Sequence, residues 1–171
     1  LAKIAAEKAG IIKHGTALVL ESQEKEAMDV LNKAAERADI KTTKVVNLNE
    51  IRILPQKDGK QCFSYAGHDA VTMKMLGVHQ YENAVAAMLA AELFFEKYFA
   101  GKKNVPERKA LQHAIREGID RTQWMGRMEL VSNDPFFLMD GAHNSNGVEA
   151  LKKSLETMYP DEKFHFIMGV M

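Results

Sequence analysis

The stretch Phe136-Phe137-Leu138-Met139-Asp140-Gly141-Ala142-His143-Asn144 decides the fold that the sequence predicts. Four apolar residues precede Asp140, and a segment with helical periodicity follows Asn144. A strand that ends in Asp-Gly and leads into a helix places an acid and an imidazole at the carboxyl end of the strand. Open α/β sheets bind their ligands at that edge. Asp140 and His143 are therefore candidate site residues, although an Asp-Gly turn is also common without a ligand.

The first part of the chain predicts a parallel α/β unit. Residues 16–20 form a short apolar run and residues 42–46 are rich in β-branched side chains, so both are typical of strands. Between them, residues 24–38 repeat apolar side chains at helical spacing. A strand, a helix and a strand in this order are typical of two parallel strands joined by a crossover helix.

An antiparallel element is predicted to follow. Residues 51–54 and 61–65 flank Asp58-Gly59, a favoured turn pair for hairpins, and residues 70–76 add a third strand. The rest of the chain alternates helices and strands. The predicted elements are a helix at 79–98, a helix that begins near Pro106, strands at 128–131 and 136–139, a helix at 145–159 and a buried strand at 164–171.

Composition restricts the classes of protein to which the chain can belong. The 23 basic residues balance the 23 acidic ones, which argues against a nucleic-acid partner, and no apolar run is long enough to suggest a membrane span. The single cysteine, Cys62, rules out an intrachain disulfide and fits a reducing compartment, so we expect a cytoplasmic protein. Residues 1–5 resemble the interior of a helix, and a strand at 164–171 needs sheet neighbours. We therefore expect an internal portion of a longer protein.

Lys8 is a candidate catalytic and metal-binding residue. It precedes Ala9-Gly10-Ile11-Ile12, a small and apolar run. Burial in such surroundings disfavours the charged form of a lysine, and a neutral amine can react with carbon dioxide to form a carbamate. A carbamate supplies the oxygen ligands that Mg²⁺ prefers. The alternative is a solvated helix lysine, which is the more common case.

The segment 77–83 places His79 and Asn83 four residues apart, on one face of the predicted helix. His79 and Gln80 fall at the helix start, where unpaired backbone N–H groups favour anions and polar ligands. Asn83 offers a donor and an acceptor, which suits the edge of an adenine ring. The alternative is that His79 and Gln80 only cap the helix.

Arg127 follows Gly126 and offers a rigid fork of donors that suits phosphate oxygens. The alternative is a surface arginine that pairs with Glu129. Trp124 is interpreted as a packing residue, because single tryptophans usually serve packing. Asn144 is the best candidate for the N-cap of the helix that follows it.

Four segments together resemble the folylpolyglutamate synthase and dihydrofolate synthase family, within the Mur ligase superfamily. They are E-K-A-G-I-I-K at 7–13, G-V-H-Q-Y-E-N at 77–83, W-M-G-R at 124–127 and D-G-A-H-N at 140–144. Met125 stands where this family usually has proline, and His14 stands where a proline often follows the second lysine. Neither departure removes a chemically active group.

The resemblance implies an ATP-dependent amide ligase with ATP and Mg²⁺ as cofactors. ATP phosphorylates a carboxylate of a reduced folate or of dihydropteroate, and the amino group of L-glutamate attacks the acyl phosphate. It also implies an α/β fold: part of a P-loop-type mononucleotide-binding Mur ligase central domain at 1–127, with an antiparallel insertion at about 50–76, and the start of a Rossmann-like C-terminal domain at 128–171. The implied site residues are His79, Asn83, Arg127 and Asp140 for ATP, and Lys8 and His143 for catalysis, with Lys8 holding Mg²⁺ as a carbamate.

The resemblance leaves a gap and two alternatives. No G-x-x-x-x-G-K-[ST] phosphate loop is present in the 171 residues, so we expect the chain alone to be inactive. The alternatives are a ligase for cell-wall peptide precursors and a non-catalytic nucleotide-binding fragment. We expect small-molecule substrates and a monomer.

Overall fold

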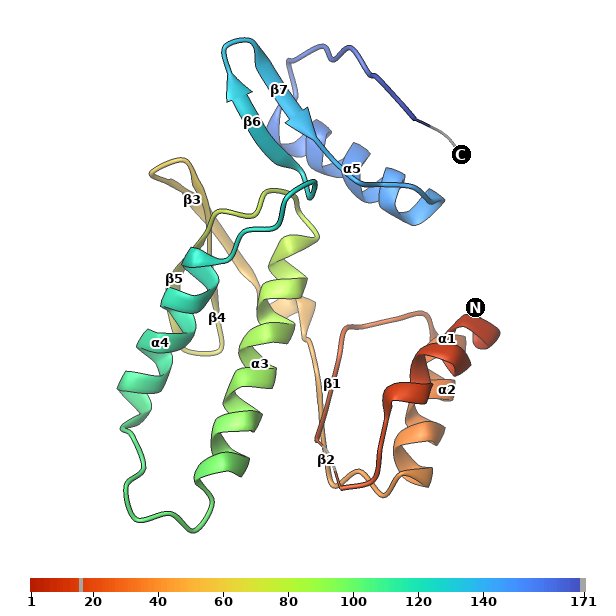
Figure 1. Cartoon of the computed structure of the whole chain (residues 1–171), viewed down its shortest axis with the longest axis vertical. Helices are drawn as coiled ribbons and strands as arrows, with labels where there is room; N and C mark the ends of the chain where they lie inside the picture. The colour runs from red at the N-terminus through yellow and green to blue at the C-terminus, as the bar shows by residue number, and fades with distance from the viewer. Residues whose placement is uncertain (16, 170–171) are drawn as a thin grey trace. The chain divides into compact units, whose positions relative to one another are not determined.

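The structure is a computed structural model that describes residues 1–15 and 17–169 (Figure 1). Contacts between residues divide the chain into two compact units. The first unit contains Leu1–Ile51 and Glu82–Ile115, and the second contains Arg52–Tyr81 and Arg116–Met171. In these described ranges, no helix is both long and apolar enough to cross a membrane. The predicted domain boundary at 127–128 stays a prediction, and it falls inside the second unit.

The first unit contains the predicted parallel strand–helix–strand motif. Strand β1 (Ala17–Leu20) pairs in parallel with β2 (Thr42–Val45), and helix α2 (Lys25–Arg37) connects them. Thr16, the predicted first residue of the strand, lies outside the described residues. The chain begins with helix α1 (Ala2–Lys8) and the 3-10 turn η1 (Ala9–Ile11), and α1 packs against α2. A second 3-10 turn, η2 (Leu48–Glu50), follows β2.

Two longer helices contribute to both units. Helix α3 (Gln80–Phe99) confirms the helix predicted at 79–98, and α4 (Arg108–Arg121) begins two residues after Pro106. Of the eight apolar positions expected inside, four are buried: Val85, Met88 and Leu93 of α3 and Ile115 of α4. The other four are partly exposed at Leu89, Leu111 and Ile119 and exposed at Ala114. The helical spacing of apolar residues therefore predicted half of these positions correctly.

The second unit begins with the predicted antiparallel element (Figure 1). Strands β3 (Arg52–Lys57), β4 (Lys60–Tyr65) and β5 (His68–Met73) form a three-stranded sheet in sequence order. The turn between β3 and β4 has positive φ at both Asp58 (52°) and Gly59 (72°), as a type I′ hairpin turn requires. The buried apolar side chains of this sheet are Cys62, Phe63, Tyr65, Val71 and Met73.

A second hairpin and a helix complete the second unit. Strand β6 (Glu129–Asn133) pairs antiparallel with β7 (Phe136–Met139), and helix α5 (Ser145–Met158) follows. Asn144 is the N-cap of α5, because its side-chain oxygen accepts a hydrogen bond from Gly147 N at 2.8 Å. The prediction that Asn144 caps the helix is therefore confirmed.

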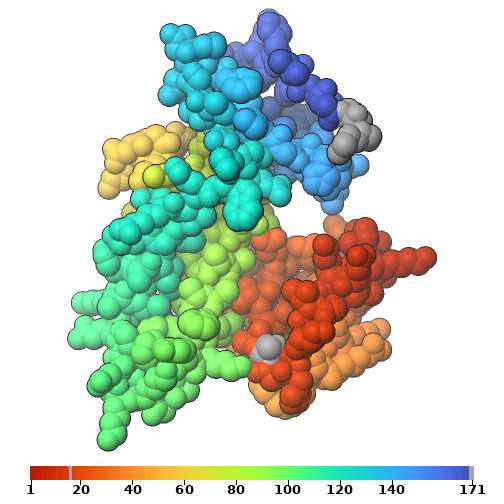
Figure 2. Space-filling view, in the orientation of Figure 1, coloured from red at the N-terminus to blue at the C-terminus, as the bar shows by residue number. Residues whose placement is uncertain are grey.

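The predicted strand at 164–171 is wrong for the part of it that the structure describes. Residues 164–169 are irregular, while Val170 and Met171 lie outside the described residues. A strand needs a neighbour that accepts and donates backbone hydrogen bonds, and the described residues provide none here. Ile167 is 96% exposed, and this segment lies at the surface, in dark blue, in Figure 2.

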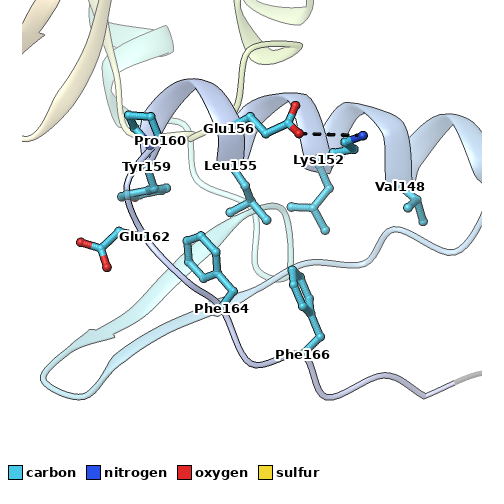
Figure 3. A pocket seen from close by; sticks show the side chains of 10 residues that line it. Val148, Lys152, Leu155, Glu156, Tyr159, Pro160, Glu162, Phe164 and Phe166 are labelled. Atoms are coloured by element: carbon cyan, nitrogen blue, oxygen red, sulfur yellow. Dashed lines mark ion pairs between the residues drawn. The ribbon is translucent and has the colours of Figure 1, made fainter.

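The segment that follows α5 makes aromatic contacts with β7 and with Tyr159, the residue after the helix. Phe164 lies with its ring centre 6.0 Å from the ring centres of both Phe136 and Tyr159. Phe164 and Phe166 face α5 across a hollow of about 280 Å³ (Figure 3). Aromatic contacts with Phe136 of β7 and with Tyr159, rather than backbone pairing with a strand, therefore hold Phe164.

Candidate functional site

Two of the four motif segments, 124–127 and 140–144, lie wholly in the second unit, and residues 77–81 of a third segment also belong to it. The turn at Gly77–Gln80 precedes α3, the loop at 124–127 joins α4 to β6, and Asp140 directly follows β7. The other predicted site residues, Lys8 and Asn83, belong to the first unit. The contacts described below join residues of these three segments within the second unit.

Asp140 bonds to backbone groups with both carboxylate oxygens. Oδ1 accepts a hydrogen bond from Ala142 N, and Oδ2 accepts one from Met128 N, each at 2.8 Å. The first bond shapes the turn that leads to α5, and the second ties this turn to the loop that carries Arg127. Each carboxylate oxygen has a second lone pair, so a hydroxyl of a ligand can still donate to Asp140.

Met128 is held in an unusual backbone conformation at the centre of these contacts. Its φ is 46°, in the left-handed region, and its side chain is only 1% exposed. A left-handed conformation costs a residue other than glycine about 1–2 kcal/mol. The hydrogen bond to Asp140 and the burial of the thioether offset this cost, so the loop geometry depends on both.

Arg127 lies in the same loop and has an exposed side chain. The alternative of an ion pair with Glu129 is wrong for the described residues, where no ion pair of Arg127 is found. Glu129 instead accepts a hydrogen bond from Gly126 N through Oε2 at 2.8 Å. The guanidinium of Arg127 is therefore accessible to an anion.

Trp124 was interpreted as a packing residue, and this interpretation is wrong: its side chain is 71% exposed. It lines a hollow of about 270 Å³ together with Lys74 and Arg127. Trp124 lies in an irregular connection rather than in a helix or strand, so no periodic pattern could have fixed the direction of its side chain.

The Gly77–Gln80 turn brings His79 back over Gly77. The φ of Gly77 is 109°, and a Cβ atom at this position would lie 2.8 Å from Cε1 of His79. Gln80 N donates to Gly77 O at 3.1 Å, and the Nε2 atoms of Gln80 and His79 lie 3.0 Å apart. Glycine is therefore required here by both backbone conformation and space. The sulfur of Met128 would lie 3.3 Å from the same Cβ, so the loop at 124–128 and this turn are in contact.

Two residues outside the motifs hold this turn. Gln61 donates through Nε2 to Met75 O at 2.8 Å and to Gly77 O at 3.2 Å, and Val78 N donates to Ser154 Oγ at 3.0 Å. Sequence reasoning missed both residues. Ser154 had a signal, because it lies on the apolar face of α5 between Leu151 and Met158, where a polar residue is unexpected.

His143 and Asn83 are exposed. His143 Nδ1 lies 2.9 Å from Gly141 O, a contact that requires a proton on Nδ1. The neutral ring then has Nε2 as an acceptor directed elsewhere. His143 can therefore accept a proton or bond to a ligand through Nε2.

Lys8 does not have the buried surroundings that the sequence suggested. It lies in the last turn of α1, and its side chain is exposed. The apolar run after it forms the turn η1, in which Ile11 is also exposed. In the ranges that the structure describes, no three His, Cys, Asp or Glu side chains are grouped to hold a metal ion.

Glu21 is a further polar residue at a strand end that sequence reasoning missed. It directly follows β1 in the first unit, at the carboxyl end of a parallel strand. Burial raises the pKa of its carboxyl group, and the nearby charge of Glu82 raises it further. A carboxyl group placed in this way is a candidate for proton transfer or for contact with a ligand.

Known proteins match this chain over almost its whole length. No protein-family model matches it. The dihydrofolate synthase/folylpolyglutamate synthase of Bacillus subtilis is 29% identical over 177 residues, which cover 99% of this chain and 38% of the relative. The chain therefore spans well under half of the length of the curated relatives that it matches.

Solved structures agree with this match. The Mycobacterium tuberculosis folylpolyglutamate synthase complexed with ADP is 28% identical and has a TM-score of 0.69, over 90% of this chain and 34% of that one. A folylpolyglutamate synthase structure with AMPPCP and folate has a TM-score of 0.79 at 22% identity, over 92% of this chain and 38% of that one. The predicted Mur ligase type of α/β fold is confirmed by these matches. By sequence and by fold, the chain belongs to the folylpolyglutamate synthase and dihydrofolate synthase family.

Proposed function

We propose that the full-length protein is an ATP-dependent ligase that adds L-glutamate to a folate or pteroate carboxylate through an acyl phosphate. The observation that carries this proposal is that contacts of Met128 join residues of three motif segments within the second unit. Its backbone N–H bonds to Asp140, and its sulfur lies against Gly77. Relatives and structural neighbours with these names support it, including structures with ADP, or with AMPPCP and folate.

The proposed nucleotide contacts follow from side-chain chemistry. Arg127 has an exposed fork of donors and suits the phosphate groups of ATP. Asp140 has lone pairs left for ribose hydroxyls, and Asn83 suits the adenine edge. His79 lies at the start of α3, where backbone N–H groups favour an anion. Each of these proposed contacts with ATP is assigned from the chemistry of the individual side chain.

His143 and Lys8 have the proposed catalytic roles. The free Nε2 of His143 bonds to the phosphate or to the folate carboxylate. The family resemblance assigns Lys8 the role of a carbamate, and in that form it would contribute an oxygen ligand to Mg²⁺. When bound, Mg²⁺ neutralises charge on the phosphate groups. Its other ligands are not supplied by a cluster among the described residues.

The substrates that we propose are ATP, L-glutamate and either a reduced folate or dihydropteroate. We also propose a cytoplasmic monomer that acts on small molecules, with neither nucleic acid nor membrane as a partner. The balanced charge of the sequence agrees with this choice of partners.

The test is glutamate-dependent release of ADP by the full-length protein, with ATP, Mg²⁺ and either dihydropteroate or tetrahydrofolate. Arg127→Ala should lower kcat/KM by about 100-fold, because a charge that stabilises the transferring phosphate is lost. Arg121→Ala is the matched control, since Arg121 is an exposed arginine that pairs with Glu117 at 3.0 Å. Turnover that needs neither pterin, or equal effects of the two variants, would contradict the proposal.

A further inference from the structure

The Gly77–Gln80 turn is fixed by side chains from two distant parts of the sequence. Gln61 lies in β4, 16 residues before Gly77, and Ser154 lies in α5, 76 residues after Val78. Neither residue belongs to a motif, and both side chains are almost completely buried, at 2% and 0% exposure. Because both side chains are buried, they form their hydrogen bonds with protein groups and not with water.

Ser154 uses its hydroxyl group in two directions. Oγ donates to Ala150 O in the preceding turn of α5 at 2.7 Å and accepts from Val78 N at 3.0 Å. A hydroxyl has one proton and two lone pairs, so both bonds can form at once. Without the hydroxyl, the N–H group of Val78 would lose its acceptor in a partly buried place.

Gln61 holds the other side of the turn. Its amide nitrogen has two protons, and these match its two acceptors, the carbonyl oxygens of Met75 and Gly77. The carbonyl of Gly77 also accepts from Gln80 N, which begins α3. Gln61 therefore orients the peptide group from which the helix starts.

We propose that Ser154 and Gln61 are positioning residues for ATP binding. They hold the Gly77–Gln80 turn so that His79 is directed at the nucleotide. Ser154 also connects this turn to α5, the helix that begins at Ser145, two residues after His143. The inference rests on the proposed function, because it assigns the turn to ATP.

The test compares Ser154→Ala and Gln61→Met with Thr157→Ala in the full-length protein. Thr157 is the matched control: it lies in the same helix and its hydroxyl donates to Lys153 O at 2.7 Å, yet it is exposed and has no bond to the turn. We expect the KM for ATP to rise about 10-fold in each of the first two variants, the size expected for loss of the one hydrogen bond that each residue makes to the turn. The kcat and the KM for glutamate should change less than twofold, and Thr157→Ala should match the wild type.

Thermal unfolding and ATP binding, measured on the same samples, separate positioning from general stability. A lower Tm with an unchanged KM and Kd for ATP in Ser154→Ala and Gln61→Met would overturn the inference. A fall in kcat alone in these two variants would also overturn the inference. An equal rise of the KM for ATP in Thr157→Ala would overturn it as well. If the wild type itself binds no ATP, both the proposed function and the inference fail. This outcome differs from failure of the inference alone, because the wild type and all three variants then behave alike.

Discussion

Replacing Asp140 with asparagine should release the loop that carries Arg127. The carboxylate of Asp140 accepts from Met128 N through Oδ2 and from Ala142 N through Oδ1. An asparagine side chain has one oxygen, so it can keep only one of these two acceptors. Its NH₂ group would then face a backbone N–H, which is repulsive.

The size of the effect follows from the burial and conformation of Met128. A hydrogen bond to a charged group contributes about 1.5–3 kcal/mol to stability. When the acceptor is removed inside a protein, the donor stays unpaired and the full contribution is lost. Met128 is 1% exposed and has a positive φ of 46°, so its N–H has no easy access to water and its conformation loses support. We expect local opening of this loop to become easier by about 2 kcal/mol, which corresponds to about 30-fold.

Hydrogen exchange measures this opening directly. In the Asp140→Asn variant of the full-length protein, the amide of Met128 should exchange about 30-fold faster than in the wild type, while amides of β4 stay unchanged. Asp134→Asn is the control, since Asp134 is an exposed aspartate in the turn of the same hairpin. Unchanged exchange at Met128 in Asp140→Asn would refute the reasoning, as would an equal increase in both variants.

Three further predictions concern other positions. Gly77→Ala should raise the KM for ATP and lower the Tm, because its Cβ would lie 2.8 Å from the ring of His79 at a φ of 109°; steady-state kinetics and thermal unfolding test this. Asp120→Asn should lower stability by about 1–2 kcal/mol at pH 7, since the hydrogen bond from Lys60 at 2.7 Å lowers the pKa of Asp120. Urea unfolding at a series of pH values should show this loss of stability shrinking as the pH falls below 3.8, the ordinary pKa of an aspartate. There the carboxylate of the wild type takes up its proton, and its contribution to stability disappears. Glu21→Gln should stabilise the protein at pH 7 and have little effect below 4.5, because burial raises the pKa of Glu21 and its ionisation costs stability as pH rises; the same unfolding series tests this.

Local patterns predicted most of the fold because the elements concerned are set by nearby residues. The hairpin at Asp58-Gly59 needs only a pair that accepts positive φ, and the cap at Asn144 needs only a side chain that reaches Gly147. The strand at 164–171 depended on neighbours from elsewhere, and so its apolar composition predicted the wrong local structure. Composition shows that a segment favours burial but not what buries it.

The site was predictable in its residue types and less so in its contacts. The motif residues Asp140 and Arg127 stood out, but the bond from Met128 to Asp140 joins residues 12 positions apart, and no periodic pattern specifies it. Lys8 was expected in apolar surroundings because apolar residues follow it, yet the turn that they form buries none of its own residues, and Ile11 is itself exposed. Ser154 could have been found as a polar residue on an apolar helix face.

The acidic residues around Arg127 explain why its charge remains available. Glu129 accepts from Gly126 N and Asp140 accepts from Met128 N, so the backbone on each side of Arg127 is bonded to a carboxylate. A carboxylate that accepts from backbone N–H groups is already oriented and is a weaker competitor for a nearby guanidinium. In the described part of the chain neither acid forms an ion pair with Arg127. The same two bonds that fix the loop therefore leave the guanidinium exposed, which is the state in which it can bind a phosphate.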